Sequence, residues 1–315
     1  MSIDKAATTY VAGHHGLVGS AIWRQLEADG YTNLVGRTSA EVDLRDREAT
    51  FDLLSELRPR NLILAAARVG GILANDQYPA EFLSDNLRVQ VNVMDAAQEM
   101  DVERLVFLGS SCIYPKLAPQ PIKEEYLMTG PLEPTNDAYA IAKIAGILQV
   151  QSARKQYGRR WISAMPTNLY GPGDNFSPET SHVLPALIRR YVEAKESGLE
   201  SVTNWGSGIP KREFLYVDDL ARAIVLLLED YDSPEPINVG TGEDQSIREI
   251  AELVAKVVGY EGEIAWDTSK PDGMPRKMLD VTRLKALGWR PSTSLEDGLR
   301  DTVTWFYDNR AAIRS

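Results

Sequence analysis

The feature that most constrains the fold is a regular alternation, over residues 8–169, of short apolar runs with longer amphipathic stretches. Short runs of aliphatic and β-branched residues predict buried strands, and stretches with a period near 3.6 predict helices. Strands that alternate with helices form βαβ units, which build a parallel sheet with helices on both faces. The pattern therefore predicts an α/β fold with a Rossmann-type, doubly wound parallel sheet. Strands are expected at residues 8–13, 33–37, 61–67, 104–111 and 160–169, and helices at 17–28, 47–59, 79–100 and 138–158.

The pattern changes after residues 170–176, where helices at about 182–197 and 245–258 alternate with loops that carry Gly, Pro and basic residues. The segment 212–229 returns to the sheet pattern. We therefore expect two discontinuous domains. Residues 1–173 plus about 213–241 would form a Rossmann domain, and about 174–212 plus 242–315 a smaller C-terminal α/β domain.

Composition excludes several classes of protein. The first 13 residues lack the basic and then apolar regions of a signal peptide, and the longest apolar runs, 62–67 and 223–228, are far shorter than the roughly 20 residues of a membrane helix. The net charge of −11 disfavours binding to nucleic acid. One cysteine cannot form an intramolecular disulfide, which fits a reducing compartment. We expect a cytoplasmic protein without a membrane or nucleic-acid partner.

Three glycines follow the first predicted strand and open the first predicted helix. Gly13, Gly16 and Gly19 have the spacing GxxGxxG. Glycine lets the backbone turn tightly and lets a pyrophosphate approach the helix N-terminus. The turn predicts a dinucleotide site of a kind found in one subclass of nicotinamide enzymes.

The end of the second predicted strand bears on the choice of cofactor. A carboxylate there would bind a ribose 2′-hydroxyl, but this chain has Arg37, which suits the 2′-phosphate of NADP. A solvated surface arginine is the plainer alternative. Asp43 and Leu44 follow and could meet the adenine edge, although Asp43 could equally cap a helix that begins near Arg45.

A tyrosine and a lysine stand one helical turn apart, 29 residues after a serine-rich strand end. Tyr139 and Lys143 share one helix face, and a lysine ammonium near a phenol is expected to lower the pKa of that phenol. Ser110 lies where the fourth strand would face the ligand crevice. A second YxxxK match, Tyr191–Lys195, lies in a stretch that we interpret as a polar, exposed helix without a catalytic role.

These features, with longer strings, resemble the extended short-chain dehydrogenase/reductase superfamily. The strings "GSSCIYPK", "EPTNDAYAIAKIAG", "MPTNLYGPGDNF", "SHVLPALIRR" and "WGSGIPKREFLYVDDLA" are similar to those of the GDP-L-fucose synthase family over nearly the whole chain. The resemblance implies conversion of GDP-4-keto-6-deoxy-D-mannose to GDP-L-fucose, by C3/C5 epimerisation followed by NADPH-dependent reduction at C4.

The resemblance also assigns roles to single residues. Ser110, Tyr139 and Lys143 match the reductase triad, and Cys112 and His182 match the base and acid of epimerisation. Without the resemblance, a lone cysteine is more often a small buried hydrophobe, and a histidine near a helix start is usually a cap or surface residue.

The expected ligand contacts form two sets. The cofactor set comprises Gly13, His15, Gly16, Leu17, Val18, Gly19, Arg37, Ser39, Asp43, Leu44, Leu108, Gly109, Ser110, Ser111, Lys143, Pro166, Thr167, Asn168, Leu169 and His182. The substrate set comprises Arg190, Trp205, Arg212, Asp272 and Lys277. Its cations could converge on a diphosphate, and Trp205 could stack on a ring or fill core. No metal is expected.

Two departures and two alternatives accompany the resemblance. His15 stands where the family often has arginine, and Ser39 where another arginine can occur, so less fixed positive charge would face a 2′-phosphate. NADPH remains the expected cofactor and NADH the fallback. A related GDP-4-keto-sugar enzyme, such as a colitose synthase, is the nearest rival, and a non-catalytic nucleotide sensor is the rival from another class. By resemblance a homodimer is expected, formed through helices 79–100 and 138–158.

Overall fold

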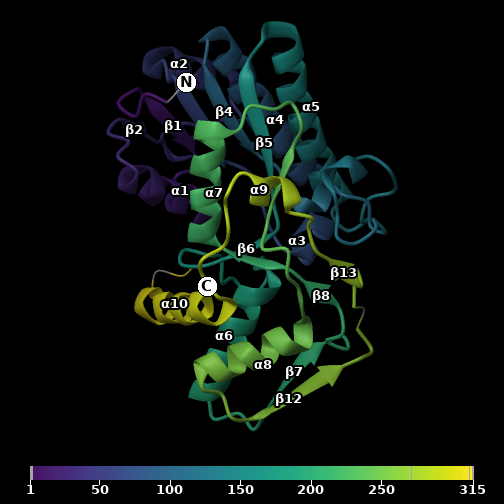
Figure 1. The fold of residues 1–315 in the computed structure, drawn as a ribbon. Coiled ribbons are helices and arrows are strands. Elements are labelled where there is room, and N and C mark those ends of the chain that lie inside the picture. The colour runs from purple at the N-terminus through teal and green to yellow at the C-terminus, as the bar shows by residue number, and fades with distance from the viewer. Residues whose placement is uncertain (1–2, 271, 312, 314–315) are drawn as a thin grey trace.

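The computed structural model describes residues 3–270, 272–311 and 313. Residues 1, 2, 271, 312, 314 and 315 lie outside the described part, so the outer limits of the two predicted domains, at 1 and 315, are not described. The chain forms two lobes, a larger one around a central sheet and a smaller one below it in the view of Figure 1.

The larger lobe is built on one six-stranded sheet in which every neighbouring pair is parallel. Its order, β10-β5-β4-β3-β1-β2, changes direction between β1 and β3, which is where ligands bind in doubly wound sheets. The predicted fold class is confirmed. The strands are β1 (Thr9–Ala12), β2 (Leu34–Val35), β3 (Asn61–Leu64), β4 (Arg104–Leu108), β5 (Arg160–Pro166) and β10 (Ile237–Val239).

Helices cover both faces of this sheet because successive strand residues point to opposite sides. Tyr10 belongs to the core on one face, under α2, α4 and α5, whereas Val11 belongs to the core on the other face, under α1 and α7. Both side chains are fully buried. The helices are α1 (Leu17–Ala28), α2 (Arg47–Leu57), α4 (Pro79–Glu99), α5 (Asp137–Tyr157) and α7 (Val217–Asp230).

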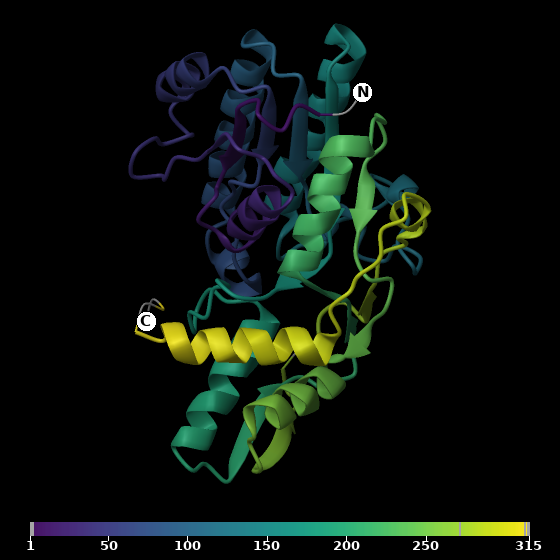
Figure 2. The same cartoon turned by 60° about the vertical axis from the view of Figure 1, so that its left-hand side comes forward.

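The smaller lobe has its own core between α6 (Val183–Glu196), α8 (Ile247–Val258) and α10 (Leu295–Asn309). Figure 2 shows α10 lying across the boundary between the lobes. Short strand pairs complete the lobe and the joint. They are β7 (Ser201–Trp205) with β12 (Glu263–Asp267), β8 (Lys211–Arg212) between β11 (Gln245–Ser246) and β13 (Arg276–Lys277), and β6 (Asn168–Tyr170) with β9 (Phe214–Tyr216).

Local signals account for the clearest helix of this lobe. The Ser246 hydroxyl accepts a hydrogen bond from the Glu249 nitrogen, and the Glu249 carboxylate accepts one from the Ser246 nitrogen, which is a capping box. Gly259 then ends α8 in the left-handed conformation. Two further helices are short, α3 (Ile72–Gln77) and α9 (Thr282–Ala286). No helix in the described part of the chain is both long and apolar enough to cross a membrane.

The structure differs from the predicted elements in several details. The second and third strands are shorter than predicted, at Leu34–Val35 and Asn61–Leu64. The fourth strand ends at Leu108, and Ser110 then caps a 3₁₀ turn over Ser111–Ile113. The fifth strand breaks at Thr167, because the chain leaves β10 there and pairs with β9 from Asn168 onward. Helix α10 was not predicted.

The domain division remains a prediction. Residues Leu284 and Trp289 of the smaller predicted domain lie in the core of the sheet lobe.

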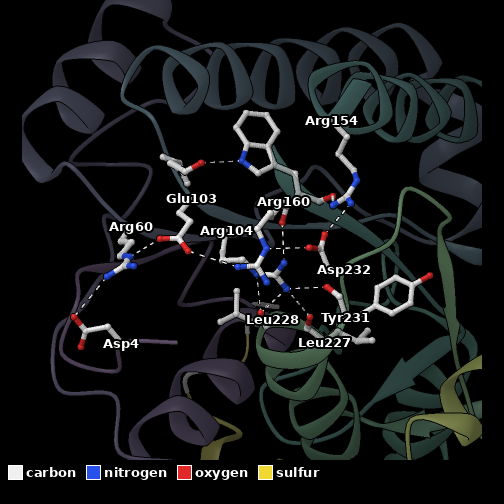
Figure 3. A network of polar contacts seen from close by, with 12 residues as sticks. Asp4, Arg60, Glu103, Arg104, Arg154, Arg160, Leu227, Leu228, Tyr231 and Asp232 are labelled. Carbon is white, nitrogen blue, oxygen red and sulfur yellow. Dashed lines mark hydrogen bonds and ion pairs between the residues drawn. The ribbon is translucent and has the colours of Figure 1, made fainter. Parts of the chain in front are cut away.

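A buried arginine at the start of β4 ties the sheet to α7 (Figure 3). The Arg104 side chain, 1% exposed, donates hydrogen bonds to the carbonyls of Leu227, Leu228 and Tyr231 at the end of α7 and to that of Arg160. The Leu227 carbonyl also accepts from the Tyr231 nitrogen, whereas carbonyls in the last turn of a helix generally lack partners within the helix, and a cation suits a helix C-terminus. Burial lowers the pKa of Arg104 to about 10, so the guanidinium keeps its charge at neutral pH.

We expect Arg104→Ala to lower the free energy of unfolding by about 3 kcal/mol or more, because buried carbonyls left without a donor each cost about 1–3 kcal/mol. The midpoint of urea unfolding measures the change. Arg60→Ala is the control, since Arg60 pairs with Glu103 in the same network but is 51% exposed, and should cost less than about 1 kcal/mol. Equal effects of the two substitutions would contradict the expectation.

Candidate active site

The glycine turn joins β1 to the N-terminus of α1 in a form that requires glycine at two positions. Gly13 has φ +85°, and a Cβ there would lie 2.8 Å from the Ala66 nitrogen. A Cβ on Gly19 would lie 2.1 Å from the Gly13 oxygen. Helix α1 has Gly16 as N-cap, no side-chain cap and no acidic residue in its first turn. The free backbone N–H groups of this turn fit a pyrophosphate.

The groups expected near a 2′-phosphate surround the end of β2. His15 and Ser39 are exposed, and Arg37 is half-buried with its guanidinium on the Gly36 carbonyl at 2.9 Å. His14 packs against His15, with ring centroids 4.0 Å apart. Burial, and then the charge of His15, lowers the pKa of His14. Among the residues expected near the 2′-phosphate, Arg37 therefore supplies the permanent positive charge.

Asp43 does not cap a helix at Arg45. Helix α2 begins at Arg47, and its N-cap is Asp46, which accepts from the Ala49 backbone. Asp43 instead accepts from the backbone and guanidinium of Arg45, and these hydrogen bonds lower the pKa of Asp43. The contact of Asp43 and Leu44 with an adenine stays a prediction.

Polar groups gather just after β4, at the carboxyl edge of the sheet. The Gly109 nitrogen donates to the Ala164 carbonyl, and a Cβ on Gly109 would lie 2.4 Å from the Met165 sulfur. Ser110 then turns the chain, with its hydroxyl accepting from the Cys112 nitrogen at 3.2 Å. Ser110 and Cys112 therefore project together from one short turn.

Tyr139, in the first turn of α5, lies beside this turn. Burial raises the pKa of the Tyr139 phenol, a charge on Cys112 raises it further, and hydrogen bonding with Ser110 lowers it by less. Lys143 does not donate to the phenol. Its Nζ donates to the Leu108 carbonyl at 2.8 Å and lies 5.8 Å from the Tyr139 ring centroid.

The pKa of Tyr139 is thus raised, whereas the tyrosine–lysine spacing predicted that it would be lowered. Burial dominates because both side chains are surrounded by protein, and burial also lowers the pKa of Lys143 to about 8. Tyr139 consequently keeps its proton at neutral pH and can give it to an oxygen nearby.

The single cysteine faces a cation. Lys277 Nζ lies 3.4 Å from Cys112 Sγ, and Lys277 itself is buried. Burial raises the pKa of the thiol, but the charge of Lys277, hydrogen bonds from Ser110 and Lys277, and the charge of Arg212 lower it by more. The net pKa of Cys112 is below its ordinary value, so the thiol is suited to act as a base.

His182 is the N-cap residue of α6 and remains exposed. The protein atoms around it, and then the charge of Lys277, lower the pKa of its imidazole. The loop before it is held by the Gly71 nitrogen, which donates to the Thr180 carbonyl at 3.0 Å. A Cβ on Gly71 would lie 2.6 Å from the Ser181 oxygen, so the loop depends on glycine there.

Residues 166–169 connect the two lobes. Pro166 ends β5, and the side chains of Thr167 and Asn168 donate to the Glu213 carbonyl at 3.4 and 2.8 Å. The carboxylate of Glu213 is fully buried and accepts from the backbone of Leu279. Sequence reasoning did not identify Glu213. The motif "KREF" contains it, but nothing in the motif names the partners that meet its side chain.

The predicted substrate residues divide into two groups. Arg212 and Lys277 belong to the group around Cys112. Arg190, Trp205 and Asp272 gather around the end of β7. Arg190 donates to Asn204 Oδ1 at 2.8 Å, and Asp272 accepts from the nitrogen and hydroxyl of Ser207, both at 2.7 Å.

Two sequence interpretations about aromatic residues are settled here. Trp205 is 61% exposed, so it does not fill core. Tyr191, expected on an exposed helix, is fully buried, and its hydroxyl accepts from Asn204 Nδ2 at 2.7 Å. That expectation was wrong because α6 buries one face against α8. Tyr191 lies in the core of the smaller lobe and is not part of the site.

The arrangement can support proton transfer at a carbon next to a carbonyl. A phenol that keeps its proton and a serine hydroxyl can stabilise a developing oxyanion, while the Cys112 thiol lies beside them as a base. Within the described residues, no group of three or more His, Cys, Asp or Glu side chains is placed to hold a metal ion.

Comparison with known proteins places the chain among nucleotide-sugar enzymes. Residues 9–240 match the NAD dependent epimerase/dehydratase family. The chain is 57% identical over 306 residues to GDP-L-fucose synthase 1 of Arabidopsis thaliana, which covers 97% of this chain and 95% of the plant protein. It is 53% identical over 314 residues to GDP-L-fucose synthase of Escherichia coli (strain K12), covering 97% of this chain and 98% of that protein.

A solved structure has the same fold as this chain over the whole length of this chain. The GDP-L-fucose synthetase from Naegleria fowleri bound to NADP superimposes with a TM-score of 0.92 at 30% sequence identity, covering 100% of this chain and 98% of that one.

Proposed function

The chain belongs to the NAD dependent epimerase/dehydratase family, and from this premise we propose that it converts GDP-4-keto-6-deoxy-D-mannose to GDP-L-fucose by inverting C3 and C5 and then reducing C4 with NADPH. The observation that carries the proposal is the meeting of the Tyr139 phenol, the Ser110 hydroxyl and the Cys112 thiol at the carboxyl end of β4. One ketone oxygen held there can serve both half-reactions.

NADPH would lie over the glycine turn, with its pyrophosphate at the N-terminus of α1 and its 2′-phosphate near Arg37. The crowded glycines and the uncapped helix start support this fit. Leu108, Gly109, Ser111, Lys143 and residues 166–169 would line the nicotinamide half. When bound, NADPH supplies the hydride.

Epimerisation needs a base and an acid. The C4 ketone acidifies the protons on C3 and C5, because the electron pair of a broken C–H bond delocalises onto the ketone oxygen. The Cys112 thiolate takes the proton, and His182 returns one from the other face. Ser110 and Tyr139 stabilise the enolate oxygen meanwhile.

Reduction uses the same oxygen. As hydride reaches C4, the ketone oxygen gains negative charge and takes the Tyr139 proton. Burial keeps that proton on Tyr139 until it is needed, because it raises the pKa of the phenol. Lys143, fixed on the Leu108 carbonyl, lies close enough to Tyr139 to stabilise the phenolate that remains.

The GDP moiety would be held by local cations, since a net charge of −11 cannot attract it. No ion pair between described residues involves Arg190, Arg212 or Lys277, so these cations can serve a diphosphate. The exposure of the Trp205 ring supports a role in stacking on a ring of the substrate.

The nearest alternative is a related GDP-4-keto-sugar enzyme, such as a colitose synthase. The presence of both Cys112 and His182 favours an enzyme that epimerises as well as reduces. A nucleotide sensor without catalysis is disfavoured by the intact Tyr139 and Lys143.

The proposed function is tested with purified protein, NADPH and GDP-4-keto-6-deoxy-D-mannose. Loss of NADPH absorbance should accompany formation of GDP-L-fucose, and NMR of the product made in heavy water should show deuterium at C3 and C5. Absence of NADPH oxidation would overturn the proposal, and oxidation without deuterium would indicate a reductase that does not epimerise.

The cofactor preference depends on Arg37. We expect Arg37→Ser to weaken NADPH binding about tenfold or more, since a hydrogen bond between charged groups contributes about 1.5–3 kcal/mol, and to leave NADH binding unchanged. Fluorescence titration with both cofactors measures this, with Arg47→Ser on the exposed side of α2 as control. If the unaltered protein binds NADH at least as well as NADPH, the argument from Arg37 is wrong.

A homodimer through α4 and α5 is part of the proposal. Val91 on α4 and Ile141 and Leu148 on α5 are exposed apolar side chains, and the last two lie seven residues apart on one helix face. A second copy packed on this face would cover them. Sedimentation that reports a monomer would contradict this part.

A cytoplasmic location is also proposed, from the single unpaired cysteine.

A further inference from the structure

Lys277 lies closer to the thiol than its expected role in holding GDP requires. Its Nζ is 3.4 Å from Cys112 Sγ, and the residue is 8% exposed. No ion pair between described residues includes Lys277, so the sulfur is the anionic partner within its reach. A thiol that loses its proton beside a buried ammonium forms an ion pair, which stabilises the thiolate.

The other charged and titratable groups near the thiol do not replace Lys277 in this role. Arg212 on β8 adds a weaker positive contribution, and Tyr139 on α5 stays neutral. Glu133 lines the same hollow as Cys112 and Lys277, but its carboxylate pairs with Lys116 at 3.0 Å. The charge of Lys277 lowers the pKa of the nearby His182 imidazole.

The position of Lys277 is set by a buried carboxylate. Lys277 pairs with Arg212 in the parallel register of β13 and β8, and its carbonyl accepts from the Glu213 nitrogen at 3.3 Å. Two residues further on, the Leu279 nitrogen donates to Glu213 Oε2 at 2.9 Å. The same side chain therefore holds the strand that carries Lys277.

Glu213 also holds the loop on its other side. Its Oε1 accepts from the Gly242 nitrogen at 2.7 Å, and a Cβ on Gly240 would lie 2.3 Å from that oxygen. Glu213 is 0% exposed, and burial raises its pKa by more than these backbone donors lower it. An amide at this position would offer one acceptor oxygen, so one of the two backbone N–H groups would face an NH₂.

We propose that Lys277 keeps Cys112 in its thiolate form, and that the Glu213 carboxylate is the positioning residue that holds Lys277 for this purpose. The consequence for catalysis rests on the proposed function. The thiolate forms a bond to the sugar C–H proton, and the electron pair of that C–H bond moves toward the ketone oxygen. The reactivity of the thiol itself does not depend on the identity of the substrate.

The test is the rate at which iodoacetamide alkylates Cys112, followed by intact mass as a function of pH, in the full chain saturated with NADP and without sugar substrate. The single cysteine makes the reaction unambiguous. Lys277→Met should slow alkylation at neutral pH about tenfold or more, since each unit added to the pKa lowers the thiolate fraction about tenfold. Lys277→Arg should restore most of the rate.

Control variants separate this role from general damage. Lys285→Met removes an equal charge eight residues away and should leave the pH profile unchanged. Glu213→Gln should shift the profile in the same direction as Lys277→Met, and Glu213→Asp should shift it less. Asp219→Asn is matched to Glu213→Gln, because Asp219 is also fully buried and accepts from two backbone nitrogens, those of Ser292 and Thr293, and it should lower stability without moving the profile.

An unchanged alkylation profile in Lys277→Met would overturn the role of Lys277. A profile moved by Lys277→Met but not by Glu213→Gln would overturn the role of Glu213. If Glu213→Gln does not fold, the Glu213→Asp profile decides. Failure of the proposed function would appear separately, as a protein with the expected thiol profile that does not turn over GDP-4-keto-6-deoxy-D-mannose.

Discussion

Replacing Tyr139 by Phe is expected to lower the rate of C4 reduction by about 10²–10⁴, the usual contribution of a positioned general acid. The substitution removes the proton that the ketone oxygen needs as hydride arrives, and it removes one donor from the enolate. It leaves the glycine turn intact, so NADPH affinity should not change. Stopped-flow loss of NADPH absorbance and a fluorescence titration of NADPH measure the two quantities.

The chain offers a matched control for this experiment. Tyr191 and Lys195 have the same spacing as Tyr139 and Lys143, but the Tyr191 hydroxyl accepts from Asn204 in the core of the smaller lobe. Tyr191→Phe should cost about 1 kcal/mol of stability and leave turnover nearly unchanged. Near-normal turnover of Tyr139→Phe would remove Tyr139 from its role.

Replacing Cys112 by Ser is expected to stop inversion. A serine hydroxyl ionises far less readily than a thiol, so the Lys277 contact can no longer produce an anion at neutral pH. Deuterium incorporation at C3 and C5 from heavy water, followed by NMR, should fall by about 10²–10⁴. Slow reduction of the unepimerised ketone can persist, because Ser110, Tyr139 and Lys143 remain.

The two substitutions therefore separate the half-reactions. Tyr139→Phe acts mainly on hydride transfer, and Cys112→Ser acts on exchange. Exchange that persists in Cys112→Ser at the normal rate would exclude the thiol as the base. The base would then be His182 or a water molecule.

The sheet was predictable because its signals are local. The apolar run before Gly13 and the amphipathic stretch after Gly16 predicted β1 and all of α1, whose limits are 17 and 28 in both prediction and structure. The short strands of the smaller lobe were missed, because segments of two residues such as β8 and β13 depend on partners distant in sequence. Helix α10 was missed because its buried face appears only once α8 lies against it.

The site was predictable only in part. The strand end and the tyrosine–lysine spacing pointed to Ser110, Tyr139 and Lys143, and motif resemblance pointed to Cys112. Spacing could not show that burial raises the pKa of Tyr139, or that the Lys143 ammonium donates to the Leu108 carbonyl and not to the phenol. It also could not show that Lys277, 165 residues from Cys112, would reach the sulfur, because that contact depends on the β8–β13 register and on Glu213.

Strand β4 has a guanidinium fixed at its first residue, Arg104, and leads within a few residues to the reactive turn at Ser110. At about 3.3 Å per residue the two ends lie roughly 20 Å apart. Because β4 is paired with β3 and with β5, loss of this anchor would act on the hydroxyl and the thiol by loosening the fold as a whole. Loss of turnover caused from that distance would be restored by cooling or by a stabilising osmolyte, whereas loss caused at the reactive turn would not.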